Sequence, residues 1–520
     1  MKYPFPFDHL ISRRDALKKM AGTAGAISLG NRLFAQAAEI NPVEIQIDPT
    51  PQHGLSSYLF MQFMEPLGAT DGSVEAAWDY RQNNWRKDVI DVTRDLAPTL
   101  MRWGGCFSSY YRWKEAVGQR DKRKPMYNLR WGGMESNQIG TAEFVDFCKL
   151  TNAKPLMCVN FESDGRRYWM KDPAGQSRVG DADEAAEWVR YCNDPNNALR
   201  IQHGHLQPHQ IKMWQIGNET SYSTKGYRCE TAVAKTIEFA LAMRRADPEI
   251  SLIGWGDSGW APRMLESAGE YLQYIAFHHM FNPDNSKKPV LQGELYRQDP
   301  EATWNQLMGA WKINDQKIRK IRDSLGNRKF PIAMTECHFS IPGRNRCDVL
   351  STWATGVAYA RMFNNYQRHG DLLKIATAAD FCGNRWQVNA VMIPTPQSKG
   401  KAYLMPVGRV MKLYRHHIGR YAVKAETQNK ELDVVASQTD KTIYLHVVNT
   451  NRTKAVRASI QVKDKTFRSG RIFEITEEPT VELSYLNSDK AMQISEKLLG
   501  PDGIWEFPAA SVSAVELYVG

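Results

Sequence analysis

Two glutamates that end apolar runs are the residues whose setting could do chemistry. The stretch "IKMWQIGNET" (211–220) ends in Asn218-Glu219, and "FPIAMTE" (330–336) ends in Glu336. Two carboxyl groups across one pocket are the equipment of glycoside hydrolysis: one gives a proton to the leaving oxygen, and the other stays ionised and attacks the anomeric carbon. The alternative for each glutamate is a solvated residue at the end of an element. Because 117 residues separate them, only the fold can bring the two together.

The elements that carry these glutamates form a regular series. Eight apolar runs of strand length lie at 56–65, 99–105, 154–161, 211–219, 251–257, 274–280, 330–336 and 372–381. Their continuous apolar character, without alternation, indicates strands buried on both faces of a parallel sheet. Amphipathic stretches of helical period separate them. The alternation predicts a (β/α)8 TIM barrel over residues 56–405.

The pattern of apolar and polar residues changes after the predicted barrel. Residues 406–520 alternate apolar and polar side chains between turn signals, as in "LDVVASQTDKTIYLHVVNTNRTKAVRASIQV" (432–462). This pattern predicts an antiparallel β-sandwich. The isolated run "VEIQID" (43–48) predicts an N-terminal strand, within residues 39–55, that packs with the sandwich.

In a TIM barrel the active site lies at the carboxyl ends of the strands, so the residues at those ends are the candidates for the site. Read in chain order, they are Glu65, Arg102, Cys106, Asn160, Asn218, Glu219, His278 and Glu336. Trp103, Trp131 and Trp386 fall in predicted loops at the same end. Each of these indoles could stack on a sugar ring, with core packing as an equal alternative.

The motifs around these residues resemble the clan A retaining glycosidases, and within them glycoside hydrolase family 51, the α-L-arabinofuranosidase type. The matching segments are "FMEPLG" (63–68), "LMRWGGCFSSYYRW" (100–113), "QIGNE" (215–219), "IAMTE" (332–336) and "VGRVMKLYRHHIG" (407–419). The resemblance implies that Glu219 is the acid/base and Glu336 the nucleophile, and that no cofactor is needed. It also implies that Asn218 binds the hydroxyl next to the anomeric carbon.

The resemblance further implies that Glu65 and Arg102 line the subsite of the cleaved sugar. An ion pair of Arg102 with Glu65 or Glu336 is an equal alternative. The chain departs from the family pattern at four positions around the sugar: Cys106 stands for Asn, Met280 for Tyr, His338 for Asn and Trp386 for Gln. We therefore expect a retained catalytic pair whose sugar-binding residues, with Asn160 and His278 among them, serve a different sugar.

The N-terminus predicts export. "SRRDALKK" (12–19) has two adjacent arginines before a mildly apolar stretch, and "AQA" (35–37) follows. This order is typical of a twin-arginine signal peptide over residues 1–38 and predicts a periplasmic or secreted protein. Residues 1–38 hold six Lys/Arg and two Asp, so the formal charge of +10 falls to +6 after cleavage. That excess weakly favours an anionic ligand.

Composition excludes several functions. With 42% hydrophobic and 24% charged residues, the chain has no apolar run of membrane-spanning length and no dense basic stretch for nucleic acid. None of the eight cysteines forms a C-x-x-C pair, and no histidines have metalloprotease spacing, so no metal site is predicted. The lone "GWGDSG" (254–259) is a weak match to a dinucleotide-binding loop.

The predicted function is a retaining glycosidase acting on a plant or algal-type carbohydrate. One alternative is another clan A exo- or endo-glycanase, with an acidic sugar included. A second, of another class, is a non-catalytic carbohydrate-binding protein on the same barrel. Homo-oligomerisation and the pairing of cysteines are left open by the sequence.

Overall fold

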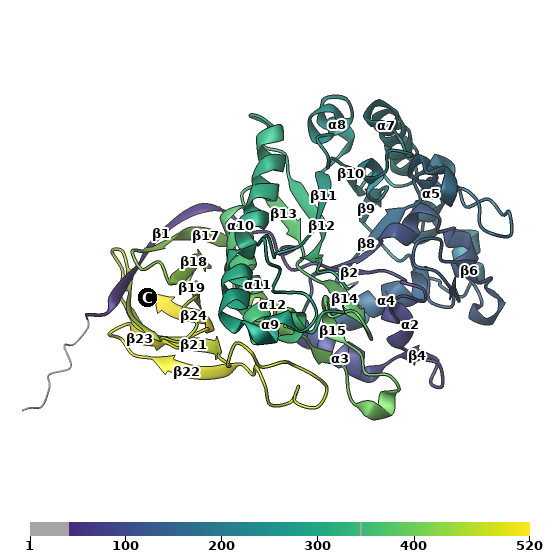
Figure 1. The fold of residues 1–520 in the computed structure, drawn as a ribbon. Helices are drawn as coiled ribbons and strands as arrows, with labels where there is room; N and C mark the ends of the chain where they lie inside the picture. Colours follow the sequence, from purple (N-terminus) through teal and green to yellow (C-terminus); the bar gives the residue numbers. More distant parts are fainter. Residues whose placement is uncertain (1–40, 344–345, 520) are drawn as a thin grey trace, which may run out of the picture. The chain divides into compact units, whose positions relative to one another are not determined.

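The computed structural model describes residues 41–343 and 346–519, and Val43–Gly520 form one compact unit (Figure 1). The predicted signal peptide lies outside the described residues. None of the described helices is both long and apolar enough to cross a bilayer.

Eight parallel strands form the barrel. In sheet order they run from β13 to β2, every neighbouring pair is parallel, and the last strand returns to the first. The backbone N–H of Met61 donates to the carbonyl of Ala376 at 2.9 Å, and Tyr58 bridges Ile375 in parallel, which closes the ring. The predicted TIM barrel is confirmed. Its strands are β2 (Gln62–Met64), β5 (Leu100–Trp103), β8 (Lys154–Val159), β9 (Met213–Ile216), β10 (Ser251–Trp255), β11 (Tyr274–Phe281), β12 (Ile332–Phe339) and β13 (Leu373–Ala376).

The barrel interior is packed with apolar side chains below the strand ends. These are Met61, Leu100, Leu156, Met213, Ile253, Trp255, Ala276, Ala333 and Ile375. Every strand, or the residue next to it, contributes to this layer. The filled interior therefore supports the site from beneath and excludes water from that side.

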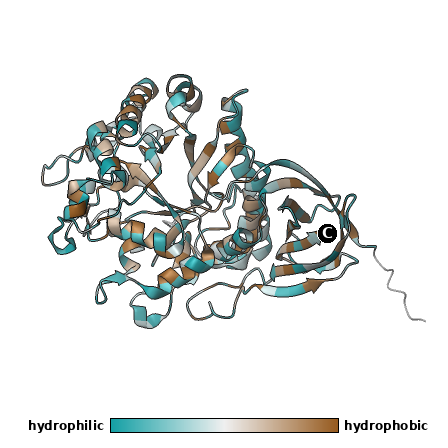
Figure 2. Ribbon diagram, turned by 180° about the vertical axis from the view of Figure 1, so that it is seen from behind, coloured by the Kyte–Doolittle hydropathy of each residue, from teal (hydrophilic) through white to brown (hydrophobic). Residues whose placement is uncertain are grey.

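Amphipathic helices surround the strands, and Figure 2 shows hydrophilic and hydrophobic residues on opposite sides of several of them. Side-chain caps begin four of the helices: Asp181 accepts from Glu184 N, Asn197 from Arg200 N, Asp299 from Ala302 N, and Thr352 from Thr355 N. The main helices are α3 (Lys87–Leu96), α4 (Thr141–Thr151), α5 (Ala182–Asn193), α7 (Cys229–Ala246), α8 (Ala261–Ala268), α10 (Pro300–Ser324), α11 (Trp353–Arg368) and α12 (Pro406–His416). Short ones are α2 (Ser73–Ala76), α6 (Ala198–Gln202) and α9 (Leu295–Gln298).

Short strands in the connecting loops decorate the barrel. They form two hairpins, β3 (Trp78–Asp79) with β4 (Asn84–Trp85) and β6 (Met126–Tyr127) with β7 (Met134–Glu135). A small separate sheet contains β14 (Asp380–Gly383), β15 (Asn389–Met392) and β16 (Tyr403–Leu404).

The C-terminal module is a nine-stranded, mostly antiparallel sheet around its own apolar core. The exception is β1 (Val43–Gly54), which pairs antiparallel with β17 but parallel with β20. Figure 1 shows this purple strand beside the yellow-green ones, so the two ends of the described chain share one sheet. The other strands are β17 (Tyr421–Thr427), β18 (Leu432–Gln438), β19 (Thr442–Asn449), β20 (Val456–Val462), β21 (Phe467–Ile475), β22 (Ser495–Leu499), β23 (Ile504–Phe507) and β24 (Val512–Val519). Residues 406–416, which precede this sheet, are helical.

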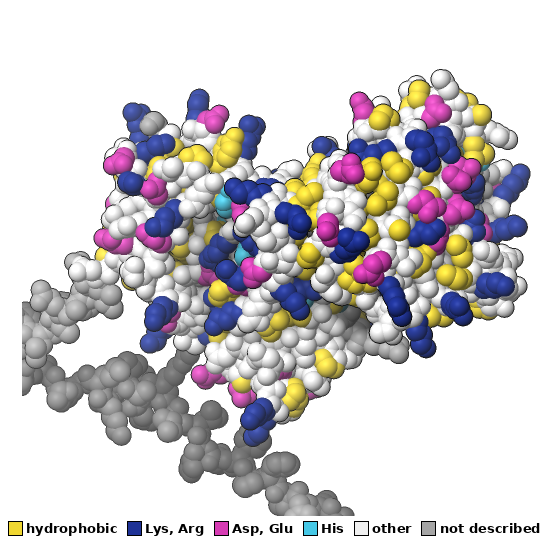
Figure 3. All heavy atoms as spheres, turned by 90° about the horizontal axis from the view of Figure 1, so that it is seen from above, with side chains coloured by type: hydrophobic (Ala, Val, Ile, Leu, Met, Phe, Trp, Pro, Cys, Tyr) yellow, Lys and Arg dark blue, Asp and Glu magenta, His cyan; other side chains and the backbone are white. Residues whose placement is uncertain are grey.

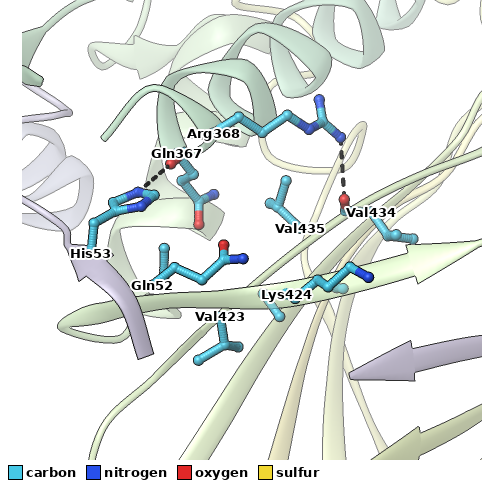
Figure 4. Close-up of a pocket in the computed structure, with 11 residues that line it drawn as sticks. Gln52, His53, Gln367, Arg368, Val423, Lys424, Val434 and Val435 are labelled. Carbon is cyan, nitrogen blue, oxygen red and sulfur yellow. Dashed lines mark hydrogen bonds between the residues drawn. The ribbon is translucent and has the colours of Figure 1, made fainter. Parts of the chain in front are cut away.

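Helix α11 joins the barrel to the sheet. Asp433 of β18 is buried and accepts from Arg361 Nε at 3.0 Å and from Asn364 and Arg368. A cavity of about 170 Å³ lies at this junction; in Figure 4 His53 Nε2 contacts the carbonyl of Gln367 across it. None of the predicted site residues lines this cavity. Its walls come from helix α11 and from strands of the nine-stranded sheet.

Candidate active site

The two predicted carboxyl groups face each other across the barrel mouth. His278 of β11 lies between them: its Nδ1 is 3.2 Å from Glu219 Oε1 and 3.5 Å from Glu336 Oε2. One oxygen of each glutamate and a nitrogen of His278 lie within 4.8 Å of one another. Retaining glycosidases hold their carboxyl groups at about 5–5.5 Å, and inverting ones at about 6.5–9.5 Å. The spacing here fits retention.

A strained turn after β9 presents Glu219. Its φ is +52°, in the left-handed region that non-glycine residues rarely adopt, and such strain is concentrated at functional sites. Asp164 holds the turn by accepting from Asn218 N at 3.2 Å and from Thr220 Oγ1 at 2.7 Å. Arg166 donates to the carbonyl of Glu219. Polar contacts from the preceding loop therefore fix the position of the carboxyl group.

Arg102 of β5 organises the floor of the site. The side chain is fully buried, and its three nitrogens donate to Gln215 Oε1 at 2.9 Å, Glu336 Oε1 at 2.8 Å and Asn218 Oδ1 at 2.6 Å. A buried guanidinium needs an anionic partner, and Glu336 supplies it. Of the two roles left open for Arg102, the structure shows the ion pair with Glu336.

Burial shifts the pKa values of the groups at the carboxyl pair in different directions. It raises the pKa of Glu219, against the opposing positive charge of Arg166, which suits a carboxyl that must hold its proton. Burial lowers the pKa of His278 to about 4, so this imidazole is neutral and can bridge the two glutamates without ionising.

Glu65 is a third carboxyl group at the site. It follows β2 and accepts from Trp131 Nε1 at 2.9 Å and from Phe107 N at 3.3 Å. Burial, together with the negative charge of Glu336, raises its pKa to about 8, so it is protonated at neutral pH and can donate to a sugar hydroxyl. Gly105 makes room for it, since a Cβ there would lie 2.2 Å from the carboxyl carbon of Glu65.

Two further predicted residues point polar atoms at the carboxyl pair. The Asn218 amide oxygen is taken by Arg102, while its buried Nδ2 has no hydrogen-bond partner within the described chain. Such an orphan donor is satisfied once a sugar hydroxyl arrives. The Cys106 thiol lies 3.6 Å from Glu219 Oε2, and burial raises its pKa well above the usual value, so it remains a neutral thiol.

His338 and Trp386 are two more of the predicted site residues. His338 follows Glu336 by two positions on β12 and therefore shares its face; its Nδ1 lies 2.9 Å from the carbonyl of Phe339, and burial lowers its pKa to about 4. The Trp386 ring meets Trp131 edge to face at 5.3 Å. Both indoles line a cavity of about 620 Å³ together with Arg130 and Asn282.

Two predicted residues have structural roles instead. The amide of Asn160 donates to the carbonyls of Tyr111 and Arg178 and accepts from Ser163 N, so both of its N–H donors are engaged within the protein. Trp103 is buried against Phe107 and Phe144 and is a core residue. The substrate-binding role of Asn160 stays a prediction.

Sequence reasoning missed Asp380, Asp164, Arg166 and Gln215. Asp380 lies 3.7 Å from His338 Nε2, and its buried Oδ1 has no hydrogen-bond partner among the described residues. Gln215 could have been found from the sequence. It lies two positions before Gly217 in the segment that leads to Glu219, and alternate residues of a strand share one face. The other three lie in loops or in a separate sheet, where no periodicity points to the barrel mouth.

A metal ion could use the same atoms, since Glu219, His278 and Glu336 offer two oxygens and a nitrogen at close range. However, Arg102 already neutralises Glu336, and burial favours the protonated form of Glu219. Both features weaken the site as a cation ligand set, and both suit proton transfer and nucleophilic attack. The eight cysteines, all in the described chain, are free thiols and take no part in a metal site.

A family model and curated relatives match part of this chain. Residues 92–298 match the family model described as alpha-L-arabinofuranosidase 1 domain, a segment that includes Arg102 and Glu219 but ends before Glu336. The chain is similar to the intracellular exo-alpha-(1->5)-L-arabinofuranosidases of Acetivibrio thermocellus (31% identity, 40% of this chain and 42% of the relative) and Halalkalibacterium halodurans (32%, 42% and 44%). These matches span less than half the length of either relative.

Solved structures share the fold over nearly the whole chain. An alpha-L-arabinofuranosidase from Thermotoga maritima, in an arabinose complex, aligns with a TM-score of 0.71 at 22% identity over 92% of this chain and 100% of that one. A GH51 arabinofuranosidase from Xanthomonas axonopodis pv. citri aligns at 0.74 and 20% over 91% and 100%. At these identities the comparison shows a shared fold, while the likeness to an arabinofuranosidase domain rests on the family-model match over residues 92–298.

Proposed function

We propose that this chain, with its α-L-arabinofuranosidase domain, is a retaining glycoside hydrolase in which Glu219 is the acid/base and Glu336 the nucleophile. The observation that carries the proposal is the pair of opposed carboxyl groups within 4.8 Å of each other, with His278 between them. The two relatives named above are described as arabinofuranosidases, so an α-L-arabinofuranoside is the first substrate to test.

The reaction would proceed in two displacements. In the first, Glu219 transfers its proton to the glycosidic oxygen while the Glu336 carboxylate attacks the anomeric carbon, and the leaving group departs with the bonding electrons. In the second, the Glu219 carboxylate takes a proton from water, which attacks the same carbon and releases the sugar from Glu336. Asn218 and Glu65 would hold the sugar hydroxyls, and Arg102 would fix the attacking oxygen.

Glutamine variants test the two roles separately. With a 4-nitrophenyl α-L-arabinofuranoside, Glu336→Gln should abolish turnover. Glu219→Gln should still release one equivalent of nitrophenol in a burst, because this leaving group needs no proton, and then turn over about 10²–10⁴-fold more slowly. NMR of the first-formed sugar should show the retained anomer. Full activity of either variant would contradict the role assigned to that glutamate, whereas no turnover of any aryl glycoside by the unaltered protein would favour the non-catalytic carbohydrate-binding alternative.

A different glycone is the second candidate, because Cys106, Met280, His338 and Trp386 replace residues typical of the family around the sugar. A panel of aryl glycosides with the same leaving group would rank the sugars by kcat/KM. Fast turnover of the arabinofuranoside alone would reject this candidate, whereas a faster pyranoside would establish another exo- or endo-glycanase.

We also propose export through the twin-arginine route to the periplasm or the medium, on the basis of "SRRDALKK" and "AQA". The two named relatives above are intracellular, so the localisation needs its own test. Expression with Arg13→Lys and Arg14→Lys should hold the uncleaved chain in the cytoplasm, while the unaltered chain appears outside it. Equal cytoplasmic retention of both would refute export.

A further inference from the structure

A second cavity opens beside Glu219 and not beside Glu336. It measures about 480 Å³, and its lining includes Glu219, Arg130, Arg166, Tyr168, Tyr222 and Met280. The acid/base of a glycosidase stands next to the leaving group, so a cavity on this side alone would accommodate the sugar that departs. This placement on the leaving-group side rests on the proposed function.

Two guanidinium groups line this cavity without a carboxylate partner. Within the described chain neither Arg130 nor Arg166 forms an ion pair, whereas the buried Arg102 and Arg178 pair with Glu336 and Glu115. A buried charge is normally paired or fully hydrogen-bonded. The two unpaired arginines therefore leave an excess of positive charge at one edge of the site.

Arg166 is the more constrained of the two. It is 4% exposed, one nitrogen donates to the carbonyl of Glu219, and its guanidinium lies 4.4 Å above the ring of Trp169. Its buried Nε has no hydrogen-bond partner among the described residues. The charge of Arg166 opposes the burial-raised pKa of both Asp164 and Glu219, but neither carboxyl group forms an ion pair with it among the described residues. The guanidinium is thus held in place without a direct carboxylate partner in the described chain.

Arg130 supplies the exposed half of the pair. Its guanidinium lies 4.9 Å above the ring of Trp131, and the residue lines both this cavity and the one beside Trp386. It therefore stands at the point where the two cavities meet. On the face that Figure 3 draws, basic and acidic side chains are interspersed.

We propose that this cavity is an anion-binding subsite, and that the leaving group of the natural substrate is an acidic sugar whose carboxylate or sulfate is bound by Arg166 and Arg130. Guanidinium groups bind both anions through paired N–H donors. Tyr222 and Tyr168 on the same wall offer aromatic faces and hydroxyls to the sugar ring.

Matched ligands test the charge preference without turnover. In calorimetry with the full chain, a galacturonic acid trimer should bind about tenfold or more tightly than its fully methyl-esterified form. The preference should shrink as ionic strength rises, since Arg130 is exposed. Galactose 6-sulfate against galactose, as a second pair, separates sulfate from carboxylate recognition: the pair with the larger preference identifies the anion.

Three variants locate the site. Arg130→Gln and Arg166→Gln should each remove most of the preference for the acid over the ester, while Arg167→Gln, an exposed neighbour outside the cavity, should keep it. Because Arg130 is exposed, its variant remains informative if Arg166→Gln fails to fold. Equal binding of acid and ester by the unaltered protein, or an unchanged preference in Arg130→Gln, would overturn the proposal.

Failure of the proposed function has a different signature. Activity on the neutral nitrophenyl arabinofuranoside tests the glycosidase without engaging the anion site. Loss of that activity with an intact acid preference would reject the arabinofuranosidase but keep the anion subsite. Activity on the neutral substrate without a preference for the acid would keep the arabinofuranosidase and reject the anion subsite.

Discussion

The proton on Glu219 is the residue-scale feature on which the reaction depends. Burial raises its pKa, and the nearby charge of Arg166 opposes that effect. The acid form is required, so kcat/KM should fall as pH rises through this raised pKa. Removing the positive charge in Arg166→Gln should move the falling limb to higher pH. The limb should appear with a sugar leaving group, which needs the proton, and be absent from the nitrophenol burst, which does not need it; a limb at an unchanged pH in Arg166→Gln would assign it to another group.

Burial raises the pKa of Asp380 as it does that of Glu219, and this shift affects the stability of the protein. Burial raises its pKa well above the usual value, with Glu336 and Glu65 adding to the effect. The native state then holds a proton that the unfolded chain has lost, so stability is greatest below the unfolded pKa of about 4 and falls as pH rises from there. Asp380→Asn lacks this loss and should gain Tm relative to the unaltered protein at pH 8 but not at pH 4. An equal Tm difference at both values would contradict the argument.

At the scale of elements, the turn after β5 must leave room for Glu65. Gly105 has a φ of +151°, and a Cβ there would clash with the carboxyl group. Gly105→Ala should displace Glu65, lower kcat/KM by about 10²-fold and cost about 1–3 kcal/mol of stability. The matched control is Gly309→Ala in α10, where nothing lies within 4 Å and alanine should stabilise by up to about 1 kcal/mol. Unchanged activity in Gly105→Ala would show that Glu65 is not held by this turn.

The barrel and the glutamates at its strand ends were predictable because buried parallel strands leave a long apolar signal and end at one face. The run at 372–381 shows the limit. It reads as one strand, but the chain leaves the barrel after Ala376, where Thr377 Oγ1 donates to the carbonyl of Ala379, and Asp380 begins β14 in another sheet. Arg166 lies in a loop, and only tertiary contacts with Trp169 and Glu219 bring it to the site.

At the scale of the whole molecule, the barrel and the nine-stranded sheet meet at a buried charge. Burial alone would raise the pKa of Asp433, but Arg368 and Arg361 lower it below the usual value. This contribution to stability is therefore present above the unfolded pKa of about 4 and is lost as pH falls through the lower folded value. Because β1 and the C-terminal strands share one sheet, loss of this contact affects both ends of the chain.

Removing the charge tests how far the two modules unfold together. Asp433→Asn leaves two arginines without a carboxylate and should cost about 3–5 kcal/mol, since one partner of a buried ion pair is lost. Calorimetry should show one transition for the unaltered protein and a separate, earlier transition for the sheet in the variant. The control, Asp91→Asn, breaks the exposed pair with Lys87 and should leave the Tm nearly unchanged. If Asp433→Asn instead lowers the Tm of a single transition, the junction is not what couples the modules, and the shared apolar packing around α11 must do so.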